Sequence, residues 1–93
     1  MKLPVSSAIQ TFTTANPGSG WTALATVACH EVAVVNNTGT DLEFRRGGAG
    51  TALVVPDGAG WVFESLANAN ELQIRRVDQS NTQVTQTYEV TTR

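Results

Sequence analysis

Residues 36–60 read NNTGTDLEFRRGGAGTALVVPDGAG, and this stretch contains the pattern that decides the fold. Turn-forming clusters, NNTG, GGAG and PDGAG, alternate with short runs that are rich in β-forming residues. Further turn signals follow at NAN around residue 69 and at DQSN around residue 79, so a turn recurs about every ten residues. This spacing predicts an all-β sandwich or barrel, and after Cys29 it leaves no window for an ordinary helix of three turns.

The runs between the turns predict short strands over residues 32–36, 41–46, 51–55, 61–66, 71–77 and 82–90, with a further strand over 22–29. Polar and apolar residues alternate in two of these runs, and their apolar members are expected on a buried face: Leu42, Phe44, Leu72 and Ile74. By contrast, residues 32–35 and 52–55 are apolar on both faces, as in a strand that is covered on both sides. One of the covers could be a neighbouring subunit.

The run DLEFRR at 41–46 returns as ELQIRR at 71–76, which indicates two related strands of one sandwich. We therefore expect a small antiparallel β-sandwich or a jelly-roll-like barrel of hairpins, with about six to eight short strands. The 93 residues suit a single domain over 1–93, in which residues 1–15 could form an extended N-terminal arm. A hydrophobic content of 41% with only 15% charged residues argues against disorder.

The net charge of −2 gives no overall field that would attract phosphates. Nucleic acid and membranes are therefore not expected as partners. The first ten residues contain no apolar run long enough for a signal peptide, so we expect synthesis in a reducing cytoplasm.

Cys29 and His30 are adjacent, and residues of these two types can act together in catalysis or bind a metal ion. Neighbours on a strand point to opposite faces, so the two side chains are not expected to share a proton or a metal ion. The chain has no second cysteine and no second histidine, which leaves the usual zinc ligand sets incomplete. We expect a buried structural Cys29, no catalytic residue, no metal, no cofactor and no enzymatic activity.

Two arginine pairs, Arg45 with Arg46 and Arg75 with Arg76, each end an alternating strand. Arg46 and Arg76 continue the inward phase of the alternation, and in one interpretation each reaches past the rim of the core and pairs with a local acid such as Asp41, Asp57 or Asp78. In the other interpretation the two pairs form a patch that contacts a partner protein, because arginine is enriched at interfaces and binds carboxylates in a bidentate manner.

Trp21 and Trp61 each follow a glycine-rich turn. Tryptophan in a small β domain is typically an anchor in the core or at an interface, and the alternative is an exposed platform for sugar rings. The candidate partner interface therefore consists of both tryptophans and the four arginines: Arg45, Arg46, Arg75, Arg76, Trp21 and Trp61.

From Cys29 onward the chain contains NNTGTDLEFRRGGAG, VPDG, LANANELQIRRVD and NTQVTQTYEV. In its general sequence pattern and in the order of its turns, this region resembles small β-sandwich proteins encoded among the structural genes of tailed bacteriophages. The resemblance implies a capsid decoration or cement protein, a dimer or trimer on the virion surface that binds the major capsid protein or other virion proteins. The alternatives are a β module of a tail or fibre, and a carbohydrate-binding module that uses Trp21 or Trp61.

Overall fold

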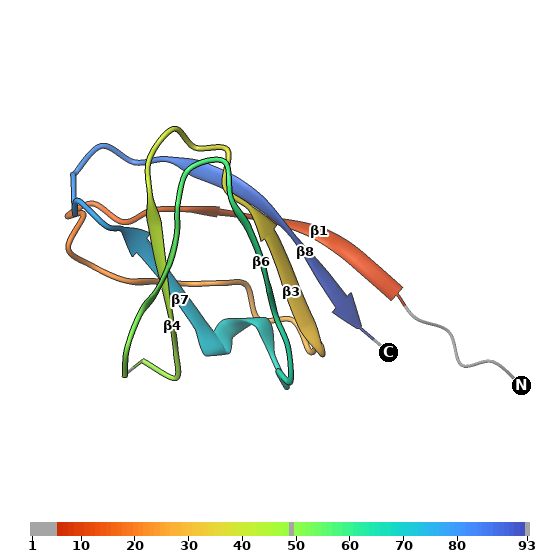
Figure 1. The fold of residues 1–93 in the computed structure, drawn as a ribbon. Helices are drawn as coiled ribbons and strands as arrows, with labels where there is room; N and C mark the ends of the chain where they lie inside the picture. The colour runs from red at the N-terminus through yellow and green to blue at the C-terminus, as the bar shows by residue number, and fades with distance from the viewer. Residues whose placement is uncertain (1–5, 49, 93) are drawn as a thin grey trace, which may run out of the picture.

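A computed structural model describes residues 6–48 and 50–92, and it confirms the expected β-sandwich. The described residues form eight strands in two antiparallel four-stranded sheets (Figure 1). The strands are β1 (Ser6–Thr13), β2 (Thr22–Ala23), β3 (Glu31–Val35), β4 (Leu42–Arg46), β5 (Leu53–Val55), β6 (Gly60–Phe63), β7 (Leu72–Arg76) and β8 (Thr85–Thr92). Helix in the described ranges is limited to the 3₁₀ turn η1 (Ala69–Glu71).

The strand order is that of a jelly roll. Sheet A has the order β1-β8-β3-β6 and sheet B has the order β2-β7-β4-β5, so the chain passes repeatedly from one sheet to the other. The first and last strands, β1 and β8, lie side by side (Figure 1) and pair over their full length. Two sheets packed in this way bury one face of each and leave the other face outside.

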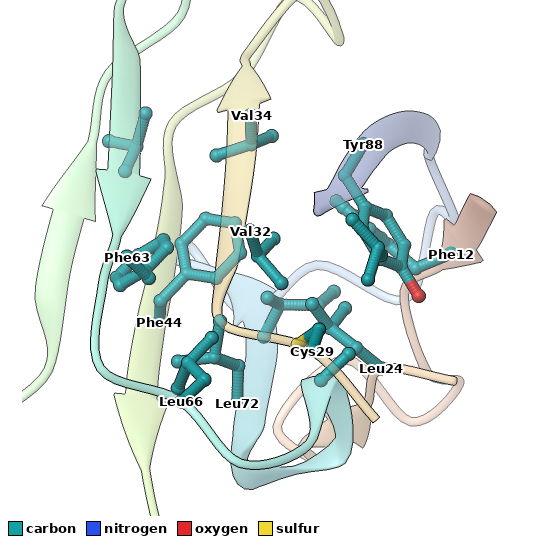
Figure 2. Close-up of a cluster of buried hydrophobic side chains, with 14 of the residues drawn as sticks. Phe12, Leu24, Cys29, Val32, Val34, Phe44, Phe63, Leu66, Leu72 and Tyr88 are labelled. Carbon is teal, nitrogen blue, oxygen red and sulfur yellow. The ribbon is translucent and has the colours of Figure 1, made fainter. Parts of the chain in front are cut away.

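The core lies between the two sheets and is formed by the inward members of each alternation (Figure 2). Leu42, Phe44, Leu72 and Ile74 are all at most 1% exposed, as their alternation predicts. The Phe44 ring of sheet B lies 6.3 Å from Phe12 and 5.0 Å from Phe63 of sheet A, measured between ring centroids. Aromatic contacts thus join the two layers, and each fully buried apolar side chain contributes about 1.5–3 kcal/mol.

The strand expected over residues 22–29 is wrong in extent, because β2 ends at Ala23. The following segment crosses from sheet B to sheet A, and its backbone bonds to both layers. Leu24 N donates to the Leu72 carbonyl of sheet B, whereas Ala25 N donates to the Tyr88 hydroxyl of sheet A. A segment that spans two layers cannot keep the ladder of a single strand.

The remaining boundaries differ from expectation by a few residues at either end. Residues 6–13 of the expected arm form β1, an edge strand of sheet A, and residues 1–5 lie outside the described ranges. The double covering expected for the strongly apolar strands is not provided within one chain. Val35 of β3 and Val54 of β5 face outward and are 54% and 47% exposed.

Candidate functional site

The outer face of sheet B carries a cluster of three side chains that the sequence singled out. Trp21, directly before β2, meets Arg45 of β4 and Arg75 of β7. The guanidinium carbons of the two arginines lie 4.2 Å and 4.3 Å from the centroid of the Trp21 ring. We call this group the arginine–tryptophan cluster, and at these distances a cation attracts the face of an aromatic ring.

Cross-strand partners hold both arginines of the cluster in place. The register of β4 and β7 sets Glu43 opposite Arg75 and Arg45 opposite Gln73. Arg75 Nε donates to Glu43 Oε1 at 2.6 Å, and Arg45 Nε donates to Gln73 Oε1 at 2.6 Å. The repeat between residues 41–46 and 71–76 is the sequence signal that could have paired these residues.

The guanidinium group of Arg45 has nitrogen atoms that remain free to donate hydrogen bonds. Arg75 also donates from Nη1 to the Ser19 carbonyl at 3.1 Å, whereas the two terminal nitrogens of Arg45 have no hydrogen-bond partner among the described residues. Arg45 is half-buried, and its contacts with Gln73 and Trp21 fix the direction of its guanidinium group. A fixed guanidinium with free terminal donors is suited to binding a carboxylate in a bidentate manner.

The second member of each arginine pair points the other way, to the rim of the core. Arg76 Nη2 lies 2.7 Å from Asp78 Oδ2, and Arg76 Nη1 donates to the Thr82 carbonyl. Arg76 therefore pairs with a nearby acid, which was one of the two interpretations of the arginine pairs. The hydrogen bond from Arg76 lowers the pKa of Asp78. Arg46 differs, because it donates to the Glu64 carbonyl at 2.9 Å. The structure thus separates Arg45 and Arg75 from Arg46 and Arg76.

The other acids considered for the arginines have backbone partners. Asp41 accepts from the Asp57 amide, and Asp57 accepts from the Gly39 amide. They fasten the loops that follow β3 and β5 to each other. Neither acid forms an ion pair within the described ranges.

Trp61 lies apart from the arginine–tryptophan cluster, on the edge strand β6 of sheet A. Its side chain is 50% exposed and lines a depression with Ala33, Val35 and Val62. Trp21, in contrast, is half-buried beneath the two guanidinium groups. The two tryptophans therefore do not form one platform.

The outer face of sheet A exposes apolar side chains. Ile9 is 66% exposed, Val35 54% and Val62 47%. The register brings Ile9 of β1, Ala33 of β3 and Val62 of β6 into one row across the sheet, with Glu89 of β8 between Ile9 and Ala33. Together with Val35 we call this the apolar face of sheet A.

The sequence indicated only part of this face. The two-sided apolar run at residues 32–35 predicted that Val35 needs a cover, whereas Ile9 was assigned to a possible arm and went unnoticed. Ile9 joins the face only because β1 pairs with β8, with Ile9 opposite Glu89.

Cys29 and His30 lie in different environments, as expected. Cys29 is 6% exposed within the core, and His30 is exposed. Burial raises the pKa of the Cys29 thiol, and the nearby Glu71 carboxylate raises it further, so the reactive thiolate is disfavoured. Within the described ranges, no three His, Cys, Asp or Glu side chains gather where they could hold a metal ion. No described helix is both long and apolar enough to cross a membrane.

Comparison with known proteins adds a structural neighbour. No protein-family model and no curated protein matches this chain. A solved structure described as "Bacillus endospore appendages form a novel family of disulfide-linked pili" is similar to it with a TM-score of 0.59. The two chains are 17% identical, and the alignment covers 95% of this chain and 83% of that chain. At this level of identity the likeness shows a shared fold.

Proposed function

We propose that this protein is a non-enzymatic structural subunit that works by binding other protein subunits in a larger assembly. The observation that carries the proposal is the apolar face of sheet A, where Ile9, Val35 and Val62 are each about half exposed or more. Exposed apolar side chains that gather on one face of a sheet typically mark a protein–protein contact. The arginine–tryptophan cluster supports the proposal, because arginine and tryptophan are enriched where interfaces are anchored.

The more specific proposal is a capsid decoration or cement protein of a tailed bacteriophage, located on the virion surface. Two observations support it: the resemblance in turn order, and a jelly-roll topology of the kind that viral capsid domains use. In this role the partner is the major capsid protein or another virion protein. The alternative within the same class is a fibre or appendage subunit, which the neighbour described as a pilus favours.

Cosedimentation tests the proposal directly. Purified protein is mixed with mature and immature phage shells and centrifuged, and the protein alone is sedimented and imaged in parallel. A decoration protein pellets with one form of shell, whereas a fibre subunit forms regular polymers without shells. A protein that stays in the supernatant as a monomer in every arm would contradict the assembly function.

A carbohydrate-binding module is the competing function, and the exposure of Trp61 is the observation that favours it. Trp21 is a poor platform because guanidinium groups already contact its ring. Titration with oligosaccharides, followed by indole fluorescence, separates the two functions. Saturable quenching that disappears in W61A would identify a sugar site, and the assembly proposal predicts no such response.

A further inference from the structure

The two outer faces of the sandwich differ in charge. Glu31 and Glu89 project from the outer face of sheet A, where they line up with Thr91 and Ala33 in the register. Neither carboxylate has an ion pair or hydrogen-bond partner among the described residues, and no described Lys or Arg lies on the strands of this sheet. The outer face of sheet B carries Arg45 and Arg75 against the single acid Glu43.

Both faces also offer apolar surface next to these charges. On sheet A, Glu89 has apolar neighbours across the sheet, Ile9 on one side and Ala33 on the other, whereas Thr87 and Thr91 flank it along β8. On sheet B, the arginine–tryptophan cluster supplies the indole of Trp21, and Val54 of β5 is 47% exposed opposite Glu43. One face therefore presents an unpaired acid beside apolar residues, and the other presents free donors beside Trp21.

We propose that the outer face of sheet A binds the outer face of sheet B of a second copy of this chain, with Glu89 of one copy accepting hydrogen bonds from Arg45 of the next. This inference rests on the assembly function proposed above and names its partner. Burying Glu89 in a contact beside Ile9 and Ala33 calls for a charged donor, because an unpaired buried carboxylate is strongly unfavourable. The free terminal nitrogens of Arg45 supply that donor from a side chain that is already fixed.

The geometry of the assembly follows from the two different faces. A contact between unlike faces is heterologous, so a bound pair, or any open chain of copies, keeps one free face of each kind. Such contacts continue into an open chain or close into a ring, and they cannot produce a two-fold symmetric dimer. A closed trimer agrees with the proposal only as a head-to-tail ring.

Charge reversal at each face tests the proposal in solution. R45E disables the sheet B face and E89K disables the sheet A face, while both chains keep one native face. Sedimentation velocity over a range of protein concentrations should show self-association of the wild type, weakened by added salt. Each variant should need a concentration at least about tenfold higher to associate. An equimolar mixture should associate again, because opposite charges then meet at both kinds of contact.

R46E is the matched control, since Arg46 is adjacent in sequence but lies at the rim of the core. It should self-associate like the wild type. Circular dichroism checks that each variant is folded, and E89K tests the same contact from an exposed position if R45E disturbs Trp21.

Three results would overturn the head-to-tail contact. They are a wild type that remains monomeric at its solubility limit, an R46E variant impaired as much as R45E, and folded variants that fail to associate when mixed. A monomeric wild type that nevertheless pellets with phage shells refutes this contact alone, and the assembly function stands. Charge-reversed variants that each self-associate as well as the wild type would also refute the contact without refuting assembly.

Discussion

At the scale of single residues, Asn36 organises one end of the sandwich. Its side chain is completely buried and donates to the carbonyls of Thr40 and Val55 at 2.8 Å and 2.9 Å. Its amide oxygen accepts from the backbone and the hydroxyl of Thr38. One side chain thus shapes the loop after β3 and ties it to the end of β5, and every bond replaces water that this position excludes.

We expect N36A to lower the free energy of unfolding by about 2 kcal/mol, because it removes the side-chain donor to the buried Val55 carbonyl and one of two side-chain donors to the Thr40 carbonyl. Urea unfolding followed by tryptophan fluorescence measures the change. N37A is the matched control, since Asn37 is exposed and, among the described residues, only its backbone amide forms a hydrogen bond. The control should change stability by less than about 0.5 kcal/mol. Equal losses in the two variants would show that the buried network is not what stabilises this end.

At the scale of elements, η1 shows how a short helix is fixed before β7. The Asn68 side chain accepts from the Asn70 amide, and the Glu71 carboxylate accepts from the amides of Ala67 and Asn68, both at 2.7 Å. This reciprocal arrangement is a capping box. The hydrogen bonds from Asn68 and then from Ala67 lower the pKa of Glu71 below its ordinary value of 4.5.

The lowered pKa predicts a pH-dependent difference between the wild type and E71Q. A carboxyl group whose folded pKa is depressed stabilises the fold above its unfolded pKa, and this contribution disappears as the pH falls through the folded pKa. The wild type should therefore be more stable than E71Q at pH 7, and the two should converge in acid below pH 4.5. Paired thermal melts across this range measure the difference, and Asp78, whose pKa is also lowered, cancels from it. A difference that stays constant with pH would argue against the charged cap.

At the scale of the whole molecule, the core encloses the single cysteine between the two sheets. Cys29 is close to Leu24 and Leu72 in the core (Figure 2), and it is 6% exposed. The neighbour is described as disulfide-linked, but a disulfide through Cys29 would require its sulfur to leave the core.

We therefore expect the proposed assembly to be independent of disulfides. The native Cys29 thiol should react with a thiol reagent far more slowly than the unfolded chain, because burial limits access and raises its pKa. Reaction kinetics with and without denaturant measure the protection, and nonreducing electrophoresis after mild oxidation checks for covalent dimers. Rapid dimer formation by the folded protein would mean that Cys29 becomes accessible.

The class of fold and much of the core could be predicted from the amino-acid sequence. Alternation identified Leu42, Phe44, Leu72 and Ile74 as buried, because inward and outward positions along a strand follow from local geometry. The regularly spaced turns predicted short strands, because turn-forming residues also act through local backbone geometry. Residues 32–35, which are apolar on both faces of the strand, also indicated an outer apolar face that another subunit could cover, and Val35 is exposed on that face.

Only the tertiary structure decided which of these strands are neighbours, and with them the candidate site. Trp21, Arg45 and Arg75 meet because β7 lies between β2 and β4, and Ile9 joins the apolar face because β1 pairs with β8. Such pairings join segments far apart along the chain, and their energies depend on the packing of both sheets together. Local sequence sets the direction in which each side chain points, whereas the packing of the whole chain sets what it meets.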